Sequence, residues 1–302
     1  METGVAKSVA KPETEDLKDP AYRKIRDMIY QISGIYQTDE KLYLLASRCT
    51  RRMNATKTTT PAEYLDHLTL RGNRDAELRL LLNEITIGET YMFRSVPQLE
   101  ALRTVILPQI LAAKGGMGFK RLRLWSAGCS TGEEPYTLAM FLLENSDKLL
   151  SGWTYEILAS DLNDNSLAAA KAGIYGEYAL RSTSEALRKK YFKPYDEKRL
   201  QATDQLKSLI RFDRVNLNDD SKMIFLKGLD LIFCCNVLIY FDLASKRKVM
   251  QHFFANLIPG GYLFLGHAES LYQVDDRFHL VHFPGTISYW KPPAGFSGAK
   301  KP

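Results

Sequence analysis

The strongest constraint on the fold is a change in hydrophobic pattern near residue 121. From there on, short apolar runs alternate with stretches of helical spacing, the pattern of parallel strands joined by crossover helices. Helices are predicted near residues 133–145, 164–172 and 243–257. The predicted strands are Leu122–Ser126, Tyr155–Ser160, Ile210–Val215, Leu229–Cys234 and Tyr262–Gly266. The pattern therefore predicts an α/β domain with a mostly parallel sheet.

A second region, residues 20–82, carries apolar residues at helical spacing only. Gly34 is placed to end the first helix, and Thr60 followed by Pro61 is a favoured helix start. This region predicts a small all-α domain. The remaining boundaries that we expect are a disordered tail at 1–19, a connecting segment at 83–94, the α/β domain at 95–292 and a tail at 293–302.

Three segments refine the α/β domain. The run His282–Trp290 is predicted to be an antiparallel edge strand, and Pro259-Gly260-Gly261 is predicted to separate the last helix from its strand. Residues 174–209 are too long for a simple connection, so they should hold structure of their own.

Composition narrows the class of protein. The chain has 302 residues, of which 45% are hydrophobic, enough for a large core. No apolar run approaches the roughly 18 residues of a membrane helix, and the polar start lacks a signal peptide, so we expect a cytoplasmic protein without direct membrane insertion.

The four cysteines contain no C-x-x-C pair, which predicts reduced, packed thiols and no metal site, with a redox role for Cys234 and Cys235 as the weaker alternative. The net charge of +6 suits an acidic partner, but no nucleic-acid motif accompanies it.

Candidate binding residues follow the first predicted strand. Gly128 and Gly132 lie where a strand turns into a helix, the place where backbone approaches a nucleotide-like cofactor. An ordinary strand-to-helix turn is the alternative. The turn matches neither the dinucleotide fingerprint nor a P-loop.

Polar residues also follow the next three strands. Asp161 is placed to bind the hydroxyls of a ribose, or alternatively to cap the next helix. Asn216 and Asn236 follow the third and fourth strands, and each alone could be a turn former. Together on one edge of the sheet they suit an adenine or a methionine-like group.

Five longer motifs stand out in the sequence: Thr90–Arg94, Trp125–Tyr136, Ala172–Tyr175, Asn236–Phe241 and Pro259–Glu269. They resemble the motifs of the CheR family, the chemotaxis methyltransferases that esterify glutamates on chemoreceptors. The resemblance extends from about Tyr22 to Trp290. It implies a class I S-adenosylmethionine-dependent methyltransferase fold with an N-terminal all-α domain and a small β-subdomain inserted at about 174–209.

The resemblance also implies a reaction and a site. The methyl group of S-adenosylmethionine would pass to a glutamate carboxylate on the cytoplasmic methylation helices of chemoreceptors, leaving S-adenosylhomocysteine, without metal or nucleic acid and by a monomer. Arg94 and Tyr240 would flank the transferred methyl. The residues implied to line the cofactor pocket, together with Gly128 in the turn, are Thr90, Arg94, Glu134, Asp161, Asn216, Leu217, Cys235 and Asn236.

Three positions depart from the family pattern or from part of it. Gly88 stands where members often have Asn, and Cys235 replaces a usual Arg. The segment Lys193–Lys198 after Tyr191-Phe192 lacks the glycine-rich turn of members that capture a receptor's C-terminal pentapeptide. We therefore expect a pentapeptide-independent enzyme.

The chemistry suits these residues. A sulfonium methyl is already activated and a glutamate carboxylate is ionised at neutral pH, with an ordinary pKa of about 4.3, so no general base is needed. The absence of an Asn/Asp-Pro-Pro-Tyr/Phe run after the fourth strand makes nitrogen a less suitable acceptor than oxygen.

A basic face at Arg48, Arg51 and Arg52 is predicted to be the surface that binds the receptor. The alternative is that these arginines form only a solvated face. Two other functions remain open, a non-catalytic cofactor sensor and a nucleic-acid methyltransferase.

Overall fold

The computed structural model describes residues 19–70, 72, 74–86, 88–116, 118, 120–223 and 226–296. The chain divides into two compact units between residues 87 and 88. Most of the two expected tails lies outside the described residues. Among the described residues, no helix has both the length and the apolar composition needed to cross a membrane.

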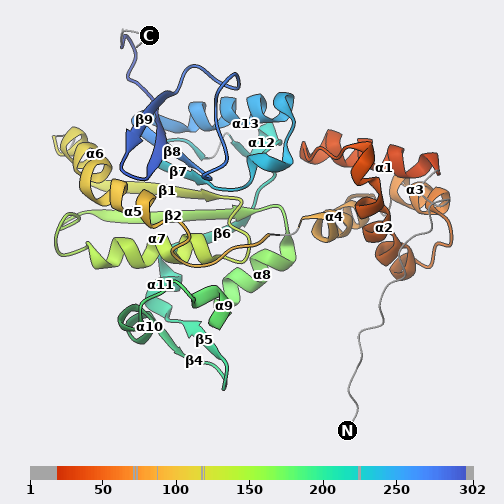
Figure 1. Cartoon of the computed structure of the whole chain (residues 1–302), viewed down its shortest axis with the longest axis horizontal. Helices are drawn as coiled ribbons and strands as arrows, with labels where there is room; N and C mark the ends of the chain where they lie inside the picture. Colours follow the sequence, from red (N-terminus) through yellow and green to blue (C-terminus); the bar gives the residue numbers. More distant parts are fainter. Residues whose placement is uncertain are drawn as a thin grey trace. The chain divides into compact units, whose positions relative to one another are not determined.

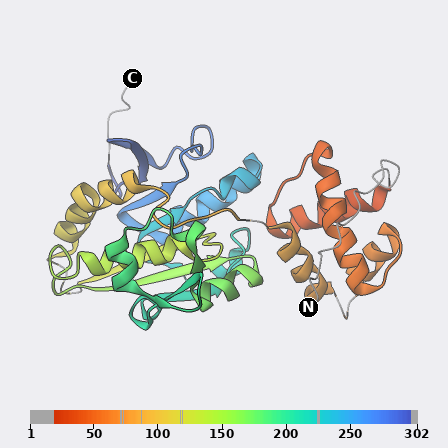
Figure 2. The ribbon, with the colours of Figure 1, turned by 60° about the horizontal axis from the view of Figure 1, so that its bottom comes forward.

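The first unit is a bundle of helices, which Figure 2 shows in red and orange. Its α-helices are α1 (Pro20–Ser33), α2 (Leu42–Thr56), α3 (Pro61–Thr69) and α4 (Arg74–Ile85), with a 3₁₀ turn at Asp39–Lys41. The predicted helix ends are confirmed. Gly34 ends α1 with φ 74°, and the Thr60 hydroxyl accepts a hydrogen bond from the Glu63 amide at 3.2 Å.

Our expected domain boundary after residue 82 falls inside α4, which continues to Ile85. The extra residues contribute to the bundle because Glu84 forms an ion pair with Arg51 at 3.2 Å. The segment 88–94 that we expected to be a connection belongs to the second unit. There the Met92 amide donates to the Ala179 carbonyl and the Phe93 amide to the Thr137 hydroxyl.

The second unit is built on a seven-stranded sheet (Figure 1). The strand order is β6-β2-β1-β7-β8-β10-β9, and the first five strands are parallel. This is the doubly wound order, in which the direction of winding reverses between β1 and β7. The strands are β1 (Arg121–Ala127), β2 (Thr154–Asp161), β6 (Ile210–Arg214), β7 (Leu229–Cys234), β8 (Leu257–Leu265), β9 (His279–Phe283) and β10 (Thr286–Trp290).

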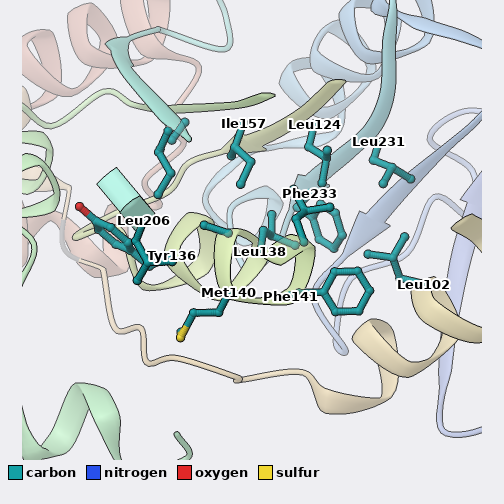
Figure 3. Close-up of a cluster of buried hydrophobic side chains, with 14 of the residues drawn as sticks. Leu102, Leu124, Tyr136, Leu138, Met140, Phe141, Ile157, Leu206, Leu231 and Phe233 are labelled. Carbon is teal, nitrogen blue, oxygen red and sulfur yellow. The ribbon is translucent and has the colours of Figure 1, made fainter. Parts of the chain in front are cut away.

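Helices cover both faces of this sheet, with α7 (Glu133–Glu144) on one side and α13 (Leu243–Asn256) on the other (Figure 1). Leu124 of β1 points toward Leu138 of α7 in the core cluster of Figure 3. The next residue, Trp125, packs edge-on against Phe253 of α13, with ring centroids 5.2 Å apart. Burial on both faces explains why the parallel strands read as continuous apolar runs.

The remaining elements of the second unit are shorter. A π-helical turn at Leu102–Ile106 joins α5 and α6, and a 3₁₀ turn, η5 (Leu238–Tyr240), follows β7. The helices are α5 (Val96–Ala101), α6 (Leu107–Lys114), α8 (Asp164–Ala172), α9 (Glu177–Leu180), α10 (Glu185–Tyr191), α11 (Asp204–Ser208) and α12 (Asp220–Met223).

Two expectations about strands were wrong in detail. The run that we expected to be one edge strand is the hairpin β9–β10, and β10 lies inside the sheet between β8 and β9. Pro259-Gly260-Gly261 lies within β8, where the register against β7 shifts. A bulge accommodates such residues without ending the strand.

The insertion at 174–209 holds its own three-stranded sheet of order β3-β5-β4, as the resemblance implied. All its pairings are antiparallel. Its strands are β3 (Ile174–Gly176), β4 (Phe192–Pro194) and β5 (Arg199–Ala202).

Candidate active site

The candidate site lies at the carboxyl ends of the parallel strands, at the point where the winding of the sheet reverses. Open sheets of this kind bind ligands there because loops leave β1 and β7 in opposite directions. Val237, just after β7, approaches Gly128 so closely that a Cβ at position 128 would lie 2.5 Å from a valine methyl. Gly128 also has φ 79°. Glycine is therefore needed at this position for the two loops to meet.

The backbone of the glycine turn is held by β2. The amides of Gly128 and Cys129 both donate to the Ser160 carbonyl, at 2.8 and 2.9 Å, and the Ser130 amide donates to the Asp161 carboxylate at 2.8 Å. These three amides already have partners within the protein. Gly128 thus serves close approach more than direct binding of a ligand by its amide.

Asp161 ends β2 and is not the cap of α8. That role belongs to Asn163, whose side chain accepts from the amides of Asn165 and Ser166. Burial raises the pKa of Asp161, and the hydrogen bonds from the backbone amides of Asn163, Ser130 and Leu162 oppose this shift. A carboxylate has about four acceptor sites, so these three amides leave about one site for a ribose hydroxyl.

Glu134, in the first turn of α7, is half-buried. It accepts a hydrogen bond from the Ser126 hydroxyl at 2.6 Å. No Lys or Arg of the described residues forms an ion pair with it. Burial raises the pKa of Glu134 to about 7, although hydrogen bonds from Ser126 and Cys235 and the charge of Arg94 oppose the shift. Such a group fits a ligand that carries a positive charge.

The Cys235 thiol lies between Glu134 and Gln98. Its sulfur is 3.7 Å from the Gln98 Oε1, and the Gln98 amide donates to the Leu265 carbonyl at 2.6 Å. Burial, together with Glu134 and other nearby acids, raises the pKa of Cys235 well above its usual range. The residue is therefore a neutral thiol donor, where a family arginine would bring a fixed positive charge. Sequence reasoning missed Gln98, which has no local motif.

Asn236 is held by an acid that the sequence reasoning had not singled out. Its backbone lies in the left-handed region, with φ 63°, and its amide donates to Glu269 at 2.8 Å. The same carboxylate accepts from the amides of Gly266 and Ile239, at 2.6 and 3.3 Å. Glu269 thus ties the loop after β8 to the loop after β7. In the sequence analysis Glu269 was only the last residue of the motif Pro259–Glu269, and no role was assigned to it.

Arg94 and Gly88 lie on the segment before α5. The exposed Arg94 donates from Nη1 to the Glu89 carbonyl at 2.7 Å. A Cβ at Gly88 would lie 2.3 Å from the Ser130 hydroxyl, so this serine occupies the space that a side chain at position 88 would need. An asparagine at position 88, which family members often have, would therefore need space that Ser130 of the turn after β1 occupies.

The other predicted site residues lie on loops at the same edge. Val215, just after β6, donates its amide to the Asp161 carbonyl at 3.2 Å, which brings Asn216 and Leu217 to the side of β2. Asn216 accepts from the Asn218 amide at 3.0 Å. Thr90 is half-buried, and Tyr240 is 45% exposed at the end of η5. No described contact joins these four residues to Glu134 or Arg94.

The predicted basic face of α2 requires a correction. Arg52 donates two hydrogen bonds to the buried Glu77, at 2.9 and 2.8 Å, and its side chain is only 16% exposed. Arg51 pairs with Glu84 at 3.2 Å but stays exposed. Arg52 is therefore part of the interior of the bundle and not of a docking surface, because packing of α4 on α2 brings Glu77 against it.

Two family profiles match this chain. The CheR methyltransferase SAM binding domain covers residues 88–287, and the CheR methyltransferase all-alpha domain covers residues 20–86. Chemotaxis protein methyltransferase 2 of Vibrio cholerae serotype O1 is 35% identical over 284 residues, which is 94% of this chain and 97% of the relative. Chemotaxis protein methyltransferase 1 of Pseudomonas aeruginosa is 34% identical over 272 residues, or 88% and 96% of the two chains.

The doubly wound sheet, the site at its switch point and the matched SAM-binding domain together define a class I S-adenosylmethionine-dependent methyltransferase. Both domains of one family are present, the all-alpha domain before the SAM binding domain. The chain belongs to the CheR methyltransferase family.

Proposed function

We propose that this protein transfers the methyl group of S-adenosylmethionine to side-chain carboxylates of glutamates on chemoreceptors, producing glutamate methyl esters and S-adenosylhomocysteine. One observation carries the proposal. The half-buried carboxyl of Glu134, which forms no ion pair among the described residues, is near the exposed guanidinium of Arg94, whose charge lowers the pKa of Glu134. A cationic methyl donor suits the first group, and an anionic acceptor suits the second. The relatives named chemotaxis protein methyltransferases support the choice of acceptor.

Different residues of the chain would bind different parts of the cofactor. Glu134 would receive its ammonium group, and Asp161 would receive a ribose hydroxyl on the acceptor site that the amides of Ser130, Leu162 and Asn163 leave. The Ser126 hydroxyl, which donates to Glu134 at 2.6 Å, would keep this carboxylate oriented. Further contacts are proposed for Thr90, Gly128, Asn216, Leu217 and Asn236 around the same edge.

When bound, S-adenosylmethionine supplies a methyl group that its positive sulfur has already activated. A glutamate acceptor, with an ordinary pKa of about 4.3, needs no base to become a nucleophile. The enzyme must then place the methyl group and the acceptor carboxylate in line with each other. Such placement can account for a large part of the activation barrier of a reaction. Arg94 would hold the acceptor carboxylate through its planar fork of donors, and Tyr240 would orient the second oxygen.

The test is methyl transfer from tritiated S-adenosylmethionine to receptor-containing membranes of the same cells. We expect base-labile label from the wild-type chain. Arg94→Ala should lower transfer by about a hundredfold or more and weaken cofactor binding. Arg211→Ala removes an exposed arginine of β6 and should leave both unchanged. Wild-type turnover by the Arg94 variant would overturn its assigned role.

Two other outcomes would redirect the proposal. Tight cofactor binding without any label would support a non-catalytic sensor, the function that Gly88 and Cys235 favour. Label that survives mild base, on a substrate bound with steep salt dependence, would indicate nucleic acid as the acceptor.

We also propose that the enzyme acts in the cytoplasm as a monomer, without metal, and that it binds receptors through Arg48 and Arg51 of α2. Charge reversal at these two arginines should raise KM for the receptor and leave cofactor affinity unchanged. Unchanged kinetics would remove the docking surface.

Independence from a receptor pentapeptide rests on the turn between β4 and β5. Asp196 closes this turn by accepting from the amides of Lys198 and Arg199, at 3.0 and 2.8 Å. The turn contains no glycine. Calorimetry with a receptor's C-terminal pentapeptide should detect no binding, and a tight complex would contradict the proposal.

A further inference from the structure

An exposed arginine next to the candidate site is held between two tyrosine rings. Arg181 follows α9, and its guanidinium carbon lies 3.5 Å from the ring centroid of Tyr91 and 3.8 Å from that of Tyr178. Tyr91 comes from the segment before α5 and Tyr178 from the inserted subdomain. Stacking of this kind fixes the plane of a guanidinium and leaves its edge open.

The edge of Arg181 has little to bind within the protein. Its Nη1 donates to the Tyr178 carbonyl at 2.6 Å, and no carboxylate of the described residues forms an ion pair with it. The nearby acid Glu177 pairs instead with Arg188, through two hydrogen bonds of 2.8 and 2.9 Å. A rigid, exposed and unneutralised guanidinium is suited to bidentate binding of a carboxylate from outside.

Arg181 is connected through hydrogen bonds to Arg94, the residue proposed to hold the acceptor carboxylate. The Tyr178 hydroxyl donates to the Glu89 carboxylate at 2.6 Å, and the Glu89 carbonyl accepts from Arg94 at 2.7 Å. The guanidinium of Arg94 also faces the Tyr91 ring, 5.9 Å from its centroid. The two arginines thus share one tyrosine ring, so they can engage two groups of the same substrate.

We propose that Arg181 binds a second carboxylate of the substrate helix, one helical turn from the glutamate that is methylated. Side chains three or four residues apart on a helix lie about 5–6 Å apart at their Cβ atoms, which suits two neighbouring guanidinium groups. Arg181 is therefore a specificity residue that selects target glutamates with an acidic neighbour. This inference rests on the proposed function.

The experiment crosses enzyme variants with substrate variants. The substrate is the purified cytoplasmic fragment of a receptor that the full-length wild-type enzyme labels, with its methylated glutamates mapped by mass spectrometry. Acidic residues three or four positions from each target are changed to glutamine. We expect Arg181→Gln to raise KM about tenfold with unchanged cofactor affinity, and Arg181→Lys to recover part of the loss. Arg211→Gln is the matched control.

The substitution of one acidic neighbour should raise KM for the wild type about tenfold and have no further effect on Arg181→Gln. Equal losses in both enzymes would overturn the inference and leave the proposed function intact. A fall in cofactor affinity or thermal stability of Arg181→Gln without any change in KM would show a purely structural role and also overturn it. No base-labile label from the wild type would overturn the proposed function itself.

Discussion

Glu77 in the helical unit and Glu134 in the methyltransferase unit have carboxyl groups in opposite electrostatic surroundings. Glu77 in the helical unit is 5% exposed and accepts two hydrogen bonds from Arg52 and one, at 2.8 Å, from the Tyr64 hydroxyl. Glu134 in the methyltransferase unit has a hydroxyl and a thiol beside it but no ion-paired cation. A charge that stabilises a fold is neutralised within it. Glu134, a half-buried carboxyl without an ion-paired cation in the first turn after the glycine turn, is a candidate partner for a cationic ligand.

The largest expected effect tests the neutralised acid. Arg52→Ala leaves Glu77 buried without its cation, which should lower the free energy of unfolding of the helical unit by about 3–5 kcal/mol. Urea unfolding followed by helical circular dichroism, with hydrogen exchange of α2 and α4, would measure it. An unchanged exchange rate in these helices would show that the Arg52 pair contributes nothing to stability.

The next effect concerns the unneutralised acid and its pH dependence. The ordinary pKa of a glutamate carboxyl is 4.5, and burial raises the folded-state pKa of Glu134 to about 7. Below pH 4.5 the group is neutral in both states, so folding carries no penalty. Between about pH 4.5 and pH 7 the unfolded chain has released the proton while the folded protein still holds it, so the free energy of unfolding falls across this window and levels off above about pH 7.

Glu134→Gln removes this pH-dependent part of the free energy. The variant should be more stable than the wild type above pH 7, by up to about 3 kcal/mol without cofactor, and should bind cofactor more weakly by about tenfold or more. The difference between the two urea-unfolding profiles from pH 4 to pH 8 isolates this residue from the other buried acids. Parallel profiles would contradict the assignment.

A smaller effect is expected at the thiol beside Glu134. Cys235→Ala removes a hydrogen bond that lowers the pKa of Glu134, so the midpoint of the pH-dependent loss should move upward, with a cost of about 1 kcal/mol. Cys49→Ala is the matched control, because Cys49 is a buried thiol in the helical unit. A midpoint that moves equally in both variants would exclude the hydrogen bond as the cause.

The smallest effect is expected at the exposed pair Arg51–Glu84. Arg51→Ala should change the free energy of unfolding by less than about 1 kcal/mol, since exposed ion pairs are weak and screened by salt. Thermal unfolding of Arg51→Ala and Arg52→Ala under the same conditions compares the two losses of stability directly. Equal losses from the two variants would remove the distinction between a buried and an exposed cation.

Local pattern was sufficient for most elements. The parallel strands, the helices between them and the caps at Gly34 and Thr60 follow from periodicity and short-range chemistry. The pattern was insufficient at β10 and at Pro259-Gly260-Gly261. Strand position in a sheet and bulges depend on partners that are distant in the sequence.

The sequence by itself determined the mostly parallel sheet and placed Gly128, Asp161 and Asn236 at one edge, because strand ends in a parallel sheet meet there whatever the rest of the chain does. Only the tertiary structure decided the state of the charges. Arg52 and Glu77 are 25 positions apart and become a pair when α2 packs on α4. Glu134, in contrast, remains without a cation because none of the arginines described around it comes within ion-pair distance. The energy of a charge depends on what lies within a few ångströms of it, and chain folding alone sets that distance.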